Sequence, residues 1–465
     1  MKNEKRKTTT LKKRLPIAIG LLVLMAVFLV LLATTSDMPK DHAINEHENN
    51  VISEYEHGRN EPLYPNLSQT DESQNETNDN QDDYTQDALP DDLYNENDDY
   101  PYDDKSEDDE NGSDDEIEDF PFRPGTPNGL HRPYEGEFEL PVTGATGWSA
   151  GRVQMRSQPN SNASVIKTLS PGQAFLILAE DGQWWNIRLG SDGETGWIPH
   201  RHCFINLPDI IPSIVYNITN AQASVTRANM TDIPNVTGHA RYEAFSFNHR
   251  LDRYEFIVPA LYSTSQKIMR AQQTALADGN TLIIYEVFRP RSSQQNAVRH
   301  IQQLMETDPE VYNALTAPPW GLNWFIATTL SNHQRGVAID MSLGTIDRAR
   351  VDVIGGFPYW KITEYTQFEM PTTMHELSPR AALLSRPVTS TSLDAWRSVP
   401  FADTITDGVL LMVEYATEAG LTPLASEWWH FNDLNGRTIA MEANITGEFY
   451  TPTIYSMRYF SQGSP

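Results

Sequence analysis

The chain has 465 residues, which is enough for two or three domains. Its formal charge of −28 is concentrated in residues 71–120, which contain 23 acidic residues and one lysine. The remainder is close to ordinary in charge, and nothing in it indicates a nucleic-acid-binding surface. Cys203 is the only cysteine, which excludes an internal disulfide framework and is typical of a bacterial wall protein.

The N-terminus predicts a membrane anchor. Residues 1–14 are basic, and residues 15–34 contain an uncharged apolar run of 19 residues from Leu15 to Ala33. A helix of that length crosses a hydrocarbon core of ~30 Å. The basic flank is expected to stay cytoplasmic, so the rest of this single-pass bacterial membrane protein is predicted to be extracytoplasmic. A cleaved signal peptide is the alternative, although its apolar region is usually shorter, ~7–15 residues.

Residues 35–135 predict an acidic, disordered linker. The segment consists largely of Asp, Glu, Asn, Ser, Tyr and Pro, with few aliphatic residues. Such a composition cannot bury enough apolar area to offset the entropy lost on ordering. Calcium binding is the alternative, but the acidic residues lack the regular spacing and the glycine of a calcium loop.

Residues 140–207 predict a small β-barrel. Short alternating segments separated by turn signals indicate strands near Val153, at Val165–Leu169, at 174–178, at Trp184–Leu189 and at 196–198. The order RSQP, LSPGQ, GQWWNIRL and GETGWIP resembles the bacterial SH3-like domain found on wall hydrolases. That resemblance implies binding of wall peptide or docking on the neighbouring domain.

The end of this region carries His200, His202 and Cys203, which raises the question of a metal site. We expect them on a terminal strand, where alternating residues point to opposite faces and no fourth ligand is near. The sequence therefore does not favour metal binding there.

Residues 208–465 read as one α+β domain. Residues 265–278 have helical periodicity, with Ile268, Ala271 and Leu276 on one face and Gly279 as a stop. TLIIYEVF then predicts a buried strand ending at Arg289-Pro290. A second helix is predicted at 407–419, ended by Gly420, and it leads into LTPLASEWWHFND.

The stretch SNHQRGVAID places His333 seven residues before Asp340. GVAID is rich in β-branched residues and predicts a strand, so Ala338, Asp340 and Ser342 share a face. Ala338 keeps that face open beside the carboxylate, and Gly336 lets the chain bend after His333. The strand would thus present Asp340 towards a shared ion.

SEWWHFND adds Glu427 and His430, so that His333, Asp340 and His430 give two imidazoles and one carboxylate. Three protein ligands plus an open position are typical of catalytic zinc, which brings its water to a pKa of ~7. Glu427 could take that proton and pass it to a leaving amine, and Arg289 could stabilise the oxyanion. In a regular strand Glu427 and His430 would face opposite ways, so we expect a bulge or twist there.

Other interpretations of these residues remain open. Each histidine could be structural, Glu427 could lie on the surface, and Arg289-Pro290 could simply form a turn. What favours a site is that the three motifs occur in one domain, each with a suitable group at the edge of an element.

The pattern SxHxxGxAxD, followed by ExWH and preceded by FRP, resembles the zinc D-Ala-D-Ala carboxypeptidase and dipeptidase family, which includes the vancomycin-resistance dipeptidases. The resemblance covers most of residues 230–445. It implies a zinc D-Ala-D-Ala peptidase-like fold, with Zn²⁺ bound by His333, Asp340 and His430. It further implies Glu427 as general base and acid and Arg289 as the group that polarises the carbonyl. Ser331 matches a substrate-side serine.

One part of the family pattern is altered. The family's dipeptidases carry an Asp-Met-Gly-Thr stretch whose aspartate holds the substrate's free amine. The nearest match here is Glu369-Met370-Pro371-Thr372, so Glu369 is the candidate for that role, one methylene longer than the family's aspartate and with Pro371 in place of the glycine. His375-Glu376 follows, but it lacks the second histidine of an HExxH motif.

The sequence therefore predicts a membrane-anchored zinc peptidase that hydrolyses D-Ala-D-Ala termini of peptidoglycan stem peptides. A D-Ala-D-Ala dipeptidase or a stem-peptide endopeptidase is the alternative within the same class. A non-catalytic protein that binds or senses the wall is the alternative of another class. The sequence says nothing of the oligomeric state.

Overall fold

The computed structural model describes residues 120–121 and 138–449. The predicted basic segment 1–14, the transmembrane helix 15–34 and nearly all of the linker 35–135 lie outside the described residues. Within the described ranges, no helix has the length and apolar character needed to cross a membrane.

The SH3-like region forms an eight-stranded sheet in the order β14-β8-β2-β5-β6-β7-β3-β4. Its strands are β2 Thr146–Ser149, β3 Val153–Arg156, β4 Val165–Leu169, β5 Ala174–Asp181, β6 Trp184–Leu189, β7 Thr195–Pro199, β8 Cys203–Asn206 and β14 Pro259–Leu261. All five strands predicted from the sequence are present. In β6 the alternating residues Trp185, Ile187 and Leu189 all point into the core, as the sequence pattern predicts.

The sheet also includes strands that the sequence did not predict. Strand β14 comes from beyond residue 207 and pairs antiparallel with β8, with Leu261 opposite Phe204. The sheet of the SH3-like region therefore continues into the segment that leads to the next helix.

The expectation of a terminal strand at residues 200–203 was wrong for the two histidines. His200–His202 form a short 3-10 helix, η1, and β8 begins only at Cys203. The His200 ring packs on Trp185 and Tyr262, with ring centroids 5.5 and 4.4 Å away. Cys203 is buried, and burial raises the pKa of its thiol. His200 and Cys203 thus contribute to packing in this region.

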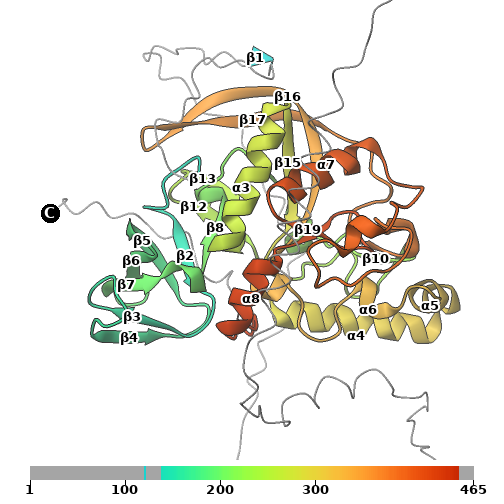
Figure 1. The fold of residues 1–465 in the computed structure, drawn as a ribbon, viewed down its shortest axis with the longest axis horizontal. Helices are drawn as coiled ribbons and strands as arrows, with labels where there is room; N and C mark the ends of the chain where they lie inside the picture. Colours follow the sequence, from blue (N-terminus) through green and yellow to red (C-terminus); the bar gives the residue numbers. More distant parts are fainter. Residues whose placement is uncertain (1–119, 122–137, 450–465) are drawn as a thin grey trace, which may run out of the picture. The chain divides into compact units, whose positions relative to one another are not determined.

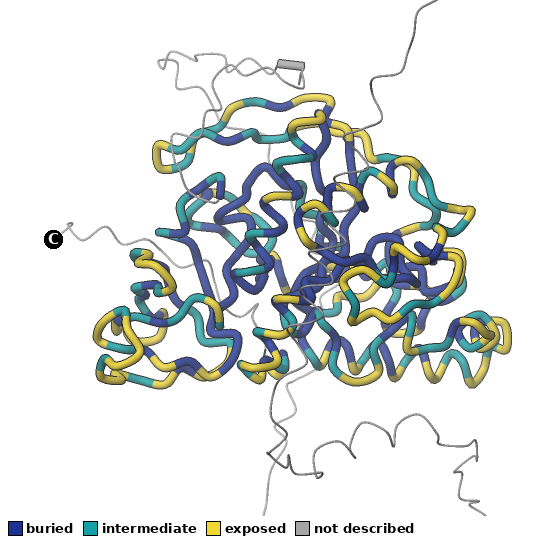
Figure 2. The backbone as a smooth tube through the Cα atoms, in the orientation of Figure 1, coloured by how far each residue is buried: buried dark blue, intermediate teal, exposed yellow. Residues whose placement is uncertain are grey.

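The second sheet has seven strands, and its central path runs β19-β20-β16-β15-β9. The strands are β1 Phe120–Pro121, β9 Val215–Tyr216, β15 Asn280–Glu286, β16 Ala338–Ile354, β17 Phe357–Gln367, β19 Thr422–Pro423 and β20 His430–Asn432. Only β15 and β9 pair in parallel. The first half of β16 is buried, whereas its second half forms with β17 a ribbon of mostly exposed or half-buried residues (Figure 2). Strand β1 pairs with β16 at Arg348 and Ala349.

The helices of the described residues are α2 Thr219–Gln222, α3 Tyr262–Ala277, α4 Arg291–Thr307, α5 Pro309–Thr316, α6 Leu322–Phe325, α7 Asp407–Glu418 and α8 Leu434–Glu442 (Figure 1). Helices α2, α3 and α7 pack against strands of the second sheet, and α5 contacts both α4 and α6. Short 3-10 helices lie at η2 Leu207–Asp209, η3 His333–Arg335, η4 Pro379–Ala381 and η5 Ala395–Ser398. Two small sheets complete the fold: β10 Arg227–Ala228 with β11 Thr231–Asp232 and β18 Glu376–Leu377, and the hairpin β12 Phe245–Asn248 with β13 Arg253–Phe256.

Both long helices predicted in this region are confirmed within a few residues. Helix α3 begins three residues earlier than expected and buries Ile268 and Ala271. Ala275 completes its buried face, while Leu276 is only half-buried. Helix α7 matches its predicted start, and Gly420 follows it at φ +87°, a conformation that glycine adopts without strain. The described chain is thus a mixed α and β structure.

Candidate functional site

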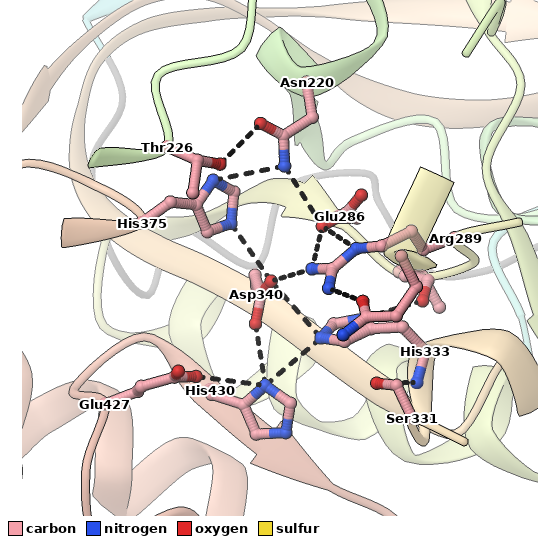
Figure 3. A network of polar contacts seen from close by, with 12 residues as sticks. Asn220, Thr226, Glu286, Arg289, Ser331, His333, Asp340, His375, Glu427 and His430 are labelled. Carbon is pink, nitrogen blue, oxygen red and sulfur yellow. Dashed lines mark hydrogen bonds and ion pairs between the residues drawn. The ribbon is translucent and has the colours of Figure 1, made fainter. Parts of the chain in front are cut away.

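Three buried ionisable residues lie in a row across the second sheet. Asp340 of β16 is directly opposite His430 of β20 on one side and Glu286 of β15 on the other. Directly paired residues of neighbouring strands present their side chains on the same face. Each of the three is at most 8% exposed. Three neighbouring strands of this sheet therefore carry adjacent, buried ionisable side chains, and apolar packing does not explain them (Figure 3).

His333 reaches this row from the turn before β16. Gly336 ends η3 in the left-handed conformation at φ +64°, and its N–H donates to the carbonyl of His333 at 3.1 Å. A Cβ at this position would lie 2.7 Å from Phe204 Cε1 and 3.0 Å from the backbone nitrogen of Leu261. The predicted bend at Gly336 is thus confirmed, and a close approach of β8 and β14 enforces it.

Hydrogen bonds fix which ring nitrogens of the two histidines carry protons. His333 Nδ1 lies 2.9 Å from the carbonyl oxygen of Val287, which can only accept, so the proton is on Nδ1. His430 Nε2 lies 3.1 Å from Asn432 Oδ1, which also accepts from the Asn332 amide at 2.8 Å. The lone pairs of His333 Nε2 and His430 Nδ1 are therefore left to face the interior of the site.

These lone pairs converge with a carboxylate. His333 Nε2 and His430 Nδ1 are 3.2 Å apart, and the Asp340 oxygens lie 3.3 Å and 2.9 Å from them. Buried acceptors this close repel one another unless a cation or a proton lies between them. Two imidazole nitrogens and one carboxylate oxygen are a ligand set that suits zinc. The residues predicted as metal ligands are thus brought together in an arrangement that fits a metal ion.

A third histidine, which the sequence analysis set aside, supports Asp340 from the opposite side. His375 Nε2 lies 3.0 Å from Asp340 Oδ2, and His375 Nδ1 lies 3.3 Å from the Asn220 side-chain nitrogen. The Asn220 oxygen accepts from Ser224 and Thr226, so its NH₂ must face His375 (Figure 3). His375 Nδ1 is then an acceptor, and its Nε2–H donates to Asp340.

Glu286, Asp340 and His375 also lie within metal-binding distance of one another. This second cluster does not suit a metal, because His375 presents N–H rather than a lone pair and Arg289 already provides a cation. Of the described residues, only these two groups have metal-binding spacing, and neither contains His200, His202 or Cys203.

Arg289 is fixed beside the row by three acceptors. Its Nε donates to Glu286 at 2.9 Å and its Nη1 donates to Gln294 at 2.6 Å, while Nη2 contacts Glu286 and lies 3.5 Å from Asp340. Burial opposes the charge of Arg289, but Glu286 outweighs it and raises the pKa of the guanidinium. The cation predicted at the end of strand β15 is therefore present and oriented.

Glu427 approaches His430 from a turn. Residues 425–429 contain turns instead of a strand, and β20 begins at His430. Glu427 Oε2 consequently lies 3.6 Å from His430 Nδ1, although the two residues are three apart. The predicted irregularity is confirmed, as a turn rather than a bulge. Burial raises the pKa of Glu427 to about 8, and His430 opposes that shift.

These groups open into a cavity of about 410 Å³. Six of the seven predicted site residues line it: Arg289, Ser331, His333, Asp340, Glu427 and His430. Glu369 is the exception, since it is exposed, lies outside the lining and holds only Thr406 Oγ1 through its backbone carbonyl at 2.7 Å. The chain leaves the sheet at the end of β17, two residues earlier, and does not return Glu369 to the site.

Sequence reasoning missed three polar residues near the metal ligands: Asn220, Arg241 and Glu286. Arg241 lines the cavity, and the other two belong to the hydrogen-bond network around Asp340. Glu286 lies in the quoted YEVFRP stretch, and an acidic residue inside a buried strand was a signal for it. Asn220 and Arg241 come from loop-rich sequence, where nothing local distinguishes them.

Comparison with known proteins bears on one part of the chain. Residues 151–203 match the family model described as bacterial SH3 domain, inside the range 140–207 predicted from the sequence. Among curated proteins the chain has no match. The chain therefore carries an SH3-like region of the bacterial type.

Proposed function

We propose that the protein is a membrane-anchored, extracytoplasmic zinc metallopeptidase that removes the terminal D-Ala from peptidoglycan stem peptides ending in D-Ala-D-Ala. The observation that carries the proposal is the convergence of His333 Nε2, His430 Nδ1 and the Asp340 carboxylate beside buried Glu427. The substrate class rests on the resemblance of the SxHxxGxAxD and ExWH motifs to the zinc D-Ala-D-Ala peptidases.

His333, Asp340 and His430 would hold the zinc ion. Zinc in such a site acts as a Lewis acid that brings the pKa of a coordinated water to ~7. Glu427 accepts a proton at Oε2 and returns it to the nitrogen of the leaving D-Ala. Its carboxyl group is buried, with Oε2 3.6 Å from His430 Nδ1, so it lies close to the position at which the ligands would hold the ion.

Arg289 stabilises the negative charge that develops on the scissile carbonyl oxygen. Its guanidinium is held in place by Glu286 and Gln294, so no reorganisation is needed when that charge appears. Ser331 is 8% exposed and lines the same cavity, where its hydroxyl can orient the substrate.

The cavity has no carboxylate to spare for a substrate ammonium group, which favours a carboxypeptidase over a dipeptidase. Only Asp340 and Glu427 among the lining residues are acidic, and both are used at the metal site. A free dipeptide would bring an ammonium group with no anion to receive it, which is unfavourable in a partly buried site. An acylated D-Ala-D-Ala brings no such group.

The rest of the chain would place this activity at the wall. The N-terminal apolar segment would anchor the protein in the membrane and the acidic linker would separate the folded part from it. The SH3-like region belongs to a class of domain associated with bacterial cell walls.

The test is mass spectrometry of products from the full-length protein in detergent, supplied with zinc. The substrates are stem pentapeptide and free D-Ala-D-Ala, with Glu427→Gln as the matched control. We expect tetrapeptide and one D-Ala from the pentapeptide, slower cleavage of the dipeptide and no products from the control. Cleavage elsewhere in the stem would establish an endopeptidase, and tight binding without any cleavage would establish a wall-binding protein.

A further inference from the structure

Arg241 lines the cavity and is held by backbone contacts on two sides. Its N–H donates to the carbonyl of Asn220 at 3.0 Å, and its own carbonyl accepts from Ser293 Oγ at 2.7 Å. Its Nη2 donates to the carbonyl of Ser293, at the start of α4, at 2.9 Å. These bonds fix the guanidinium of Arg241 at the wall of the cavity.

The positive charge of Arg241 has no counter-ion in salt-bridge contact. No carboxylate of the described residues lies within 4.0 Å of it, and its Nε is buried without a hydrogen-bond partner. Arg289 differs, because Glu286 neutralises it directly. Burial lowers the pKa of Arg241 to about 10, the charge of Arg289 adds to that effect, and Glu286 and Asp340 oppose it without reaching salt-bridge contact. Arg241 therefore remains a cation at neutral pH.

The rest of the cavity adds to this excess of positive charge. Arg335 and Arg437 also line it without a carboxylate in salt-bridge contact, and Arg335 Nε is likewise buried without a partner. Partly buried guanidinium groups are stabilised when a carboxylate bonds to them. The cavity thus suits a ligand that brings its own negative charge.

We propose that Arg241 binds a carboxylate of the peptide substrate. This inference rests on the proposed function and deepens it, because it makes an anionic peptide the preferred ligand. Two carboxylates offer the same chemistry: the terminal α-carboxylate of the peptide and a side-chain carboxylate in its acyl portion. A residue with a purely structural role would not distinguish between peptides that differ only in charge.

The experiment measures binding apart from turnover. Calorimetry uses the full-length, zinc-loaded Glu427→Gln protein with and without Arg241→Ala or Arg241→Lys. The three probes are acetyl-Gln-D-Ala-D-Ala as the acid, the same peptide as its amide, and acetyl-Glu-D-Ala-D-Ala amide. Arg299→Ala is the matched control, since Arg299 is exposed on α4, the helix that Arg241 contacts through Ser293, and its guanidinium donates to Asn296.

We expect Arg241→Ala to weaken binding of one carboxylate probe about 10- to 100-fold, as loss of a charged hydrogen bond does. Binding of the uncharged amide should stay within about twofold, and Arg241→Lys should recover part of the loss. Loss with the acid identifies the terminal carboxylate, and loss with the Glu peptide identifies the side chain.

An equal loss for all three probes, or no loss for any, would overturn the assignment. The proposed function is tested separately by turnover of the wild-type protein. Charge-dependent binding without any turnover would refute the peptidase and keep the carboxylate site. Turnover with binding insensitive to Arg241 would do the opposite.

Discussion

The core of the SH3-like region and the surroundings of Asp340 are both buried but are filled differently. In β6 the buried residues are Trp185, Ile187 and Leu189, which need only shape and volume from their neighbours. The oxygens of Asp340 face polar or charged groups instead, with atoms of Arg289, His375 and His430 at 3.5, 3.0 and 2.9 Å. An apolar core tolerates substitutions that conserve volume, whereas each member of a polar network depends on a named partner.

The largest effect should follow removal of a metal ligand. We expect His333→Ala and His430→Ala to lose bound zinc and all turnover, because two ligands cannot retain the ion in competition with water. Metal analysis by mass spectrometry, after exchange against a weak chelator, measures this loss. One zinc ion per chain in both variants would contradict the assignment of His333 and His430 as ligands.

The next largest effect concerns Glu427. Glu427→Gln keeps the size of the side chain and removes its basicity, so kcat should fall by about 10²–10⁴. Zinc content should equal that of the wild type, because the carboxylate lies beside His430 without completing the ligand set. Loss of zinc together with activity would make Glu427 a fourth ligand instead.

A substitution in the apolar core should affect stability alone. Ile187 is fully buried in β6, and Ile187→Ala should lower the free energy of unfolding by about 2–5 kcal/mol through the cavity it leaves. Zinc affinity should not change at temperatures where the variant is folded. Denaturant titration and zinc titration on the same preparation separate the two effects. A parallel fall in zinc affinity would show that the two regions are coupled.

The smallest effect is expected at His375. His375→Ala removes the donor to Asp340 Oδ2 and one of the two acceptors of the Asn220 NH₂ group, so zinc affinity should fall about 10- to 100-fold. His375→Gln, whose amide can supply an N–H to Asp340, should recover part of this affinity. If zinc binds the alanine variant as tightly as the wild type, His375 has no positioning role.

The difference between the two regions also explains what could be predicted from the sequence. Strands β4 and β6 were predicted to the residue, because the information is local: β6 alternates between buried and half-buried residues, and turn signals bound β4. The candidate metal ligands could be named from the sequence because their spacing and residue types are chemically unusual, and the bend at Gly336 followed from the same stretch.

The parts that failed depend on contacts distant in sequence. Strand β14 pairs with a strand more than fifty residues earlier, and no local pattern marks a three-residue strand. His375 acquires its role from Asn220 and Asp340, which lie on separate elements. Glu369 was chosen by similarity to a motif, but its position depends on where the chain goes after β17. Local sequence does not encode that path.

Gly336 lies against Phe204 and Leu261, so strands β8 and β14 of the first sheet pack against the turn that carries His333. Leu261 pairs with Phe204 in the first sheet and donates its N–H to the carbonyl of Gly336 at 2.9 Å, three residues after His333. Phe204 directly follows the matched residues 151–203, so the matched region continues in the chain into a strand that packs against the His333 turn. The residues that match a known family are therefore not the same set as the residues that hold the His333 turn in place. Deleting residues 140–207 would remove Phe204 and leave the turn at Gly336 without one of its packing partners.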